Sequence, residues 1–120
     1  MKVMIGALLL LVAAAGVPLA AQDYRLLSGD YLVEGQNPDG ASGYQGMASI
    51  TATGDTFQVE WNIGEQLYFG TGIAYGEVLS VGYDGGTAYY QIGKDGVLHG
   101  LWTTIGSDRL GTEILTPIFH

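Results

Sequence analysis

The chain has 120 residues and no cysteine, and its twelve acidic residues against four basic ones give a net charge of −8. Disulfides are therefore excluded, and so are metal sites held by cysteine. Nucleic acid and anionic lipid are not expected partners, because both are bound mainly through lysine and arginine. The length fits one compact domain.

Residues 1–21 have the composition of an export signal. A lysine at the second position precedes a long apolar run, and Ala20-Ala21 end it as small residues end a cleavable signal. We expect cleavage there, which leaves residues 22–120 as a single mature domain. That domain has three basic and twelve acidic residues, and hence a net charge of −9. The leader predicts a periplasmic or secreted protein of a bacterial cell envelope, without stable membrane insertion after cleavage.

Glycine recurs throughout the mature domain, and no stretch has helical apolar spacing for three turns. Alternation with period two fits better. The clearest case is Phe57–Asn62, which alternates apolar and polar residues as a strand with one buried and one solvated face does. Turn-forming dipeptides such as Asp84-Gly85 separate the segments. We predict about eight strands, over residues 31–35, 44–52, 57–62, 67–74, 78–83, 87–92, 97–103 and 109–116.

The short links between these strands favour an up-and-down antiparallel order. They permit either a small closed β-barrel or a two-sheet β-sandwich. Alternating small and bulky residues favour the barrel, because small opposite large is how a narrow barrel is filled. Gly70-Thr71-Gly72 is expected to mark a bend, a bulge or a close approach by another group, and the bend that barrel curvature needs is favoured. The small positions are Gly46, Ala48, Gly70, Gly72 and Gly100, and the bulky ones are Phe57, Trp61, Phe69, Tyr83, Tyr90 and Trp102.

Four short motifs extend over most of the mature domain. They are Gly43-Tyr44-Gln45-Gly46, Gly54-x-x-Phe57-x-Val59-x-Trp61, Gly70-x-Gly72 and Asp95-Gly96-x-Leu98-x-Gly100-x-Trp102. Through these motifs the chain resembles the small exported proteins of Gram-negative bacteria that are rich in glycine and aromatic residues and are often labelled fibronectin-binding or uncharacterised. The resemblance implies an exported, β-rich protein of adhesive character, and it implies no particular site residues.

Few residues suit catalysis or metal binding. His99 is the one imidazole inside the domain, and no second histidine or cysteine is present there to complete a zinc site. No serine lies in a nucleophile elbow. An enzyme would need a cleft that holds His99 or two carboxylates. We expect no enzyme, no cofactor and no bound metal; the carboxylates that stay open for such a cleft are Glu60, Glu65 and Glu77.

Aromatic content is the feature that points to binding, with eight tyrosines and two tryptophans. Tyrosine buries apolar area and keeps a hydrogen-bonding tip, so it suits pocket linings and interfaces. Neighbouring Tyr89 and Tyr90 must point to opposite faces of their strand. The candidate residues for binding a ligand or partner are Tyr68, Tyr75, Tyr89, Tyr90, Trp61 and Trp102.

Two binding functions stay open. The first is a non-catalytic protein that holds a protein or envelope component on its aromatic-rich barrel surface, in an adhesive or fibronectin-binding-like role, and it predicts an exposed aromatic patch. The second is a calyx that carries a small apolar or aromatic ligand. The calyx needs an open barrel end and a cavity that Trp61, Trp102 and Phe57 leave unfilled.

Overall fold

A computed structural model describes residues 23–120, so the predicted export signal lies outside the described residues. A short 3-10 turn, η4 (Tyr24–Leu27), precedes eight strands. The strands are β1 (Gly29–Gln36), β2 (Gly43–Thr53), β3 (Thr56–Ile63), β4 (Gln66–Tyr75), β5 (Val78–Tyr83), β6 (Gly86–Ile92), β7 (Leu98–Thr104) and β8 (Gly111–Ile118).

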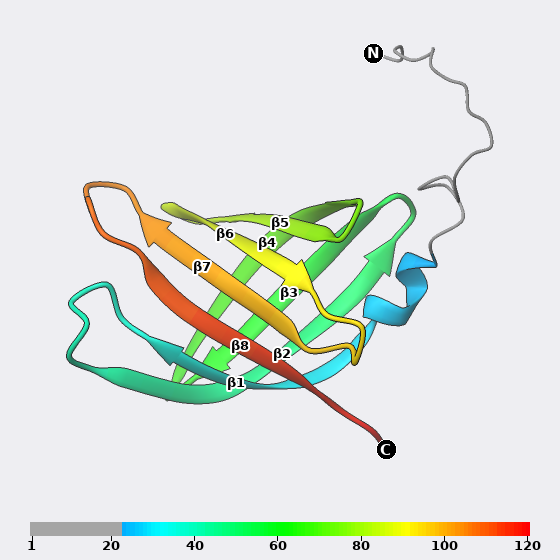
Figure 1. Cartoon of the computed structure of the whole chain (residues 1–120), viewed down its shortest axis with the longest axis horizontal. Helices are drawn as coiled ribbons and strands as arrows, with labels where there is room; N and C mark the ends of the chain where they lie inside the picture. The colour runs from blue at the N-terminus through cyan, green and yellow to red at the C-terminus, as the bar shows by residue number, and fades with distance from the viewer. Residues whose placement is uncertain (1–22) are drawn as a thin grey trace, which may run out of the picture.

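These strands form one closed antiparallel barrel in up-and-down order (Figure 1). Each strand pairs with its neighbour in the sequence, and β8 pairs with β1 from Asp30 opposite Ile118 to Gln36 opposite Thr112. The predicted eight-stranded barrel is confirmed, and the two-sheet alternative is excluded. Within residues 23–120, no helix has the length and hydropathy that crossing a bilayer requires.

One end of the barrel is filled by apolar side chains and covered by η4. Leu27 of η4 is buried, and its carbonyl oxygen accepts a hydrogen bond of 2.7 Å from the hydroxyl of Tyr31. The hydroxyl of Tyr24 donates to the carbonyl of Gly76 in the β4–β5 turn. Strand alternation directs the apolar members of this end inward; they include Ile50, Phe57, Leu79, Leu98 and Leu115.

The other half of the interior is built from aromatic rings that lie over glycines of the adjacent strand. In four cross-strand pairs, the ring occupies the space that a Cβ on the opposite glycine would need. The prediction of small residues opposite large ones is confirmed by these contacts. The pairs are Tyr44 with Gly35, Tyr83 with Gly86, Tyr90 with Gly100, and Trp102 with Gly111.

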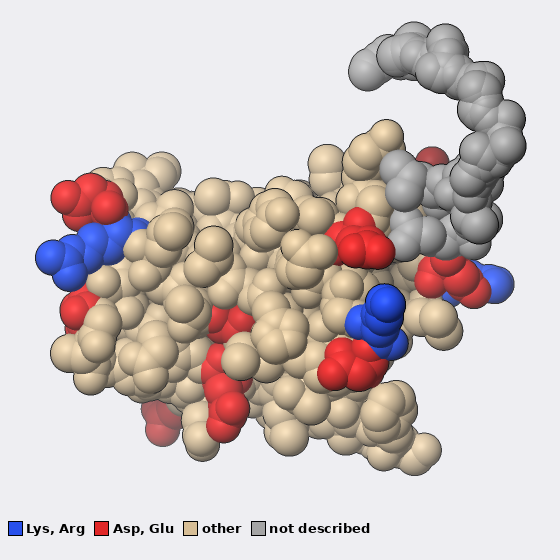
Figure 2. Space-filling model, in the orientation of Figure 1, with Lys and Arg blue, Asp and Glu red and all other residues tan. Residues whose placement is uncertain are grey.

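Strand β4 departs from the predicted packing. Phe69 was expected to fill the interior, but it points outward opposite Glu60 and is 62% exposed. The inward face of β4 holds glycine instead, and a Cβ on Gly70 would lie 2.7 Å from Cγ1 of Val81. Gly70 therefore serves a close approach between strands. On the face seen in Figure 2, basic side chains lie beside acidic ones toward the left and the right, and uncharged surface separates these groups from acidic side chains near the middle.

Replacing Gly100 with alanine tests the packing of rings on glycines. An added Cβ would lie 2.5 Å from Cδ1 of the buried Tyr90 ring, so we expect Gly100→Ala to lower the free energy of unfolding by about 1–3 kcal/mol. Gly82→Ala is the matched control, because nothing lies within 4 Å of its added Cβ. The control should be neutral or raise stability by about 0.5 kcal/mol. Equal losses in urea unfolding would contradict the packing account.

Candidate functional site

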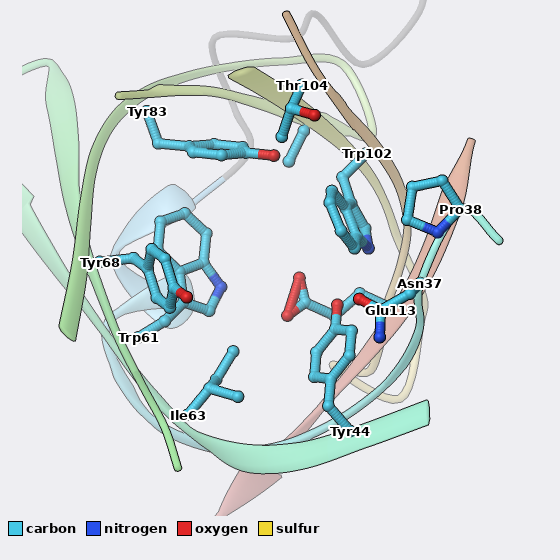
Figure 3. A pocket seen from close by; sticks show the side chains of 11 residues that line it. Asn37, Pro38, Tyr44, Trp61, Ile63, Tyr68, Tyr83, Trp102, Thr104 and Glu113 are labelled. Carbon is cyan, nitrogen blue, oxygen red and sulfur yellow. The ribbon is translucent and has the colours of Figure 1, made fainter. Parts of the chain in front are cut away.

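The barrel end opposite η4 contains a cavity of about 520 Å³. Ligand pockets in proteins commonly measure about 300–1,000 Å³. Its lining comes from the β1–β2 loop and from the halves of the strands that lie away from η4 (Figure 3). The lining residues are Asn37, Pro38, Tyr44, Trp61, Ile63, Tyr68, Tyr83, Ala88, Trp102, Thr104 and Glu113.

Aromatic rings in edge-to-face contact make up much of the cavity wall. Tyr44 meets Trp102 edge to face with ring centroids 6.1 Å apart, and Trp61 meets Tyr83 in the same way at 5.7 Å. Two of these rings are also tied to the backbone. Nε1 of Trp102 donates to the carbonyl of Thr112 at 3.2 Å, and the hydroxyl of Tyr83 donates to the carbonyl of Thr103 at 3.0 Å. These contacts fix the positions of the rings in the wall.

A single carboxyl group, that of Glu113, lies inside this aromatic wall. Glu113 projects inward from β8, is 5% exposed, and accepts a hydrogen bond of 2.6 Å from the hydroxyl of Tyr90. Its partners in register are Gly35 on β1 and Gly100 on β7, and the rings of Tyr44 and Tyr90 lie over these two glycines. No lysine, arginine or histidine lines the cavity. The carboxyl is thus buried without a basic partner.

Burial changes the protonation of this carboxyl. Desolvation raises the pKa of Glu113 to about 7, although the hydrogen bond from Tyr90 and the nearby donors of Tyr44 and Trp61 lower it in part. Burial and the negative charge of Glu113 raise the pKa of Tyr90 and Tyr44 in turn. Near neutral pH, Glu113 therefore exists in both forms while the phenols remain neutral.

Trp61 supplies a second polar group to the same place. Its Nε1 is buried and has no hydrogen-bond partner, and in Figure 3 this nitrogen faces the middle of the cavity, as the Glu113 carboxyl does. A buried donor without a partner is uncommon in folded proteins. The inner part of the cavity therefore offers a ligand the acceptor of Glu113 and the donor of Trp61 within a largely apolar wall.

The residues considered for catalysis do not gather in this cavity. His99 and Glu60 are exposed on the outer face of the barrel, and Glu65 and Glu77 are exposed in the β3–β4 and β4–β5 turns at opposite barrel ends. Among residues 23–120, no group of three or more histidine or acidic side chains is placed to hold a metal ion.

The six aromatic candidates divide into three groups. Trp61, Tyr68 and Trp102 line the cavity, and Tyr90 lies buried and holds Glu113. Tyr75 and Tyr89 point outward and are 77% and 48% exposed. Eight of the eleven cavity residues were not selected from the sequence, and the aromatic and acidic ones among them are Tyr44, Tyr83 and Glu113. A signal for Glu113 is its spacing of two from Leu115, which places both side chains on one face.

The sequence matches no protein-family model and no curated protein. The observations that bear on function are therefore the closed eight-stranded barrel and the aromatic cavity at one of its ends.

Glu113→Gln tests the burial of the carboxyl through stability. Because the pKa of Glu113 is raised from 4.5 to about 7 on folding, the folded state retains a proton that the unfolded state loses in this range. The contribution of this retained proton to the free energy of unfolding is fully present below pH 4.5. It is lost as the pH rises to about 7 and stays lost above that. The contribution is on the order of 3 kcal/mol.

The variant should therefore exceed the parent in free energy of unfolding at about pH 8, and that advantage should shrink toward about pH 5. Urea unfolding at both pH values measures the difference, and Glu60→Gln on the outer face is the matched control. A constant difference between Glu113→Gln and the parent across this range would contradict the assignment.

Proposed function

We propose that the mature domain is a non-catalytic carrier of a small apolar or aromatic ligand in the cell envelope or outside the cell. The observation that supports this proposal best is the cavity of about 520 Å³ with its aromatic wall. Eight-stranded barrels are wide enough either to be filled by side chains or to hold one small ligand. Here Phe57 fills the η4 end, whereas Trp61 and Trp102 stand in the wall and leave space between them.

The chemistry of the cavity favours binding over catalysis. Its lining has a single carboxyl and no histidine, lysine or serine. Acid–base catalysis usually pairs two titratable groups with separated pKa values, and covalent catalysis needs a nucleophile beside a base. A few polar groups within an apolar lining are typical of sites that orient a bound small molecule.

Binding of the neutral dye N-phenyl-1-naphthylamine tests the carrier function. We expect a saturable rise in dye fluorescence at one dye per domain, because the apolar cavity shields the dye from water. Thr104→Phe narrows the cavity from its exposed rim and should weaken dye binding about tenfold, which is about 1.4 kcal/mol.

Thr116→Phe is the matched control, because Thr116 is exposed on the outer face of the same barrel and lies toward the η4 end of β8. The control should bind the dye as the parent does. An unsaturable signal, or equal effects of the two substitutions, would refute binding in the cavity.

A second candidate function, the holding of a macromolecular partner, is favoured by the outer face of β4. Leu67, Phe69, Ile73 and Tyr75 form a stripe there, and each is between 53% and 77% exposed. Contiguous exposed apolar surface often marks an interaction site. The resemblance to small exported proteins that are often labelled fibronectin-binding or uncharacterised is compatible with this second candidate. This stripe faces away from the cavity, so Thr104→Phe leaves it unchanged.

A further inference from the structure

We propose that the cavity binds an organic cation, a protonated amine or quaternary ammonium group attached to an apolar body, with its charge beside Glu113. This inference rests on the proposed carrier function and names the ligand class of that same cavity.

The buried carboxyl of Glu113 has no basic partner in the cavity. Glutamate is almost never fully buried unless it is paired, because removing a carboxylate from water is costly. Glu113 is 5% exposed, and the groups that donate to its carboxyl are neutral: the hydroxyl of Tyr90 at 2.6 Å, with Tyr44 and Trp61 as nearby donors. No lysine, arginine or histidine lines the cavity. A cationic ligand would supply the countercharge that the protein does not.

The aromatic wall of the cavity also favours a cation. Five aromatic side chains surround the space next to Glu113, as Figure 3 shows. The faces of aromatic rings carry partial negative charge and attract cations, and ammonium ligands are commonly held in cages of such rings. An anion would meet the carboxylate of Glu113 and would be repelled by it. The rings are Tyr44, Trp61, Tyr68, Tyr83 and Trp102.

The charge of the whole domain acts in the same direction. The mature chain carries a net charge of −9, with three basic side chains against twelve acidic ones. Arg25 is held by Asp23 in an ion pair of 2.9 Å at η4, and Lys94 and Arg109 lie in links between strands, outside the cavity lining. A negative field of this kind raises the local concentration of cations and speeds their association.

The titratable groups around Glu113 give the proposal a defined pH dependence. They are the phenols of Tyr44 on β2, Tyr83 on β5 and Tyr90 on β6, and the pKa of each is raised above its usual value. These phenols stay neutral around neutral pH, so Glu113 alone changes charge there. Affinity for a cation should fall about tenfold per pH unit below a pH of about 7 and level off above it.

Three probes that share one phenyl body test the charge preference. Phenethylamine carries an ammonium group, 2-phenylethanol a neutral hydroxyl and phenylacetate a carboxylate. Each competes with N-phenyl-1-naphthylamine for the cavity of the full mature domain at about pH 8. We expect phenethylamine to displace the dye at concentrations at least about tenfold lower than 2-phenylethanol requires, and phenylacetate to displace it least.

Glu113→Gln identifies the residue responsible. The variant should lose affinity for phenethylamine by about 10- to 100-fold, while its affinity for 2-phenylethanol stays within about twofold. Glu60→Gln, which removes a charge from the outer face, should keep the affinity of the parent for both probes. The pH profile of phenethylamine binding to the unmodified domain gives a second measurement that needs no variant to fold.

The outcomes separate this inference from the carrier function. Equal affinities for the three probes, a preference for the alcohol or the acid, or no displacement by phenethylamine would overturn the cation site. Each of these results would leave the carrier function standing, because the dye itself would still bind. Failure of the parent domain to bind the dye at all would overturn both proposals.

Discussion

The pairing of an aromatic ring with a glycine on the next strand is the constraint on which both the barrel and its cavity depend. A barrel of eight strands is narrow, so a large inward side chain needs an empty position opposite it. In this protein the ring lies over the glycine itself, and tyrosine or tryptophan takes the place of the missing side chain. Rings held against the wall in this way leave space between them at the barrel end opposite η4.

Glu113 depends on the same constraint. It lies between Gly35 and Gly100 in the register of β1, β8 and β7, and those two glycines seat the rings of Tyr44 and Tyr90. The hydroxyl of Tyr90 then reaches the carboxyl at 2.6 Å. Closure of the barrel between β8 and β1 is what brings Gly35 to this position. The buried carboxyl lowers the free energy of unfolding above neutral pH. Under the proposed binding function, a cationic ligand would compensate this buried charge.

Local sequence patterns predict the fold well, but they do not predict the site. Period-two alternation and Asp-Gly turns depend on neighbouring residues, and the eight strands follow from them. Glu113 was missed because Ile114 beside it is apolar and points outward, so β8 does not reveal which of its faces is buried. Phe69 was misplaced for a similar reason, since β4 has apolar residues on both faces. The pairing register between strands decides which face of β8 and which face of β4 point into the barrel. Local sequence patterns do not contain this register.

The most direct test of the carrier account is native mass spectrometry of the mature domain purified from its own host, compared with the denatured mass of the same sample. The account predicts one small organic molecule bound per domain, absent from Thr104→Phe purified in the same way. A bare domain, or the same bound mass in the parent and in Thr104→Phe, would contradict binding in the cavity.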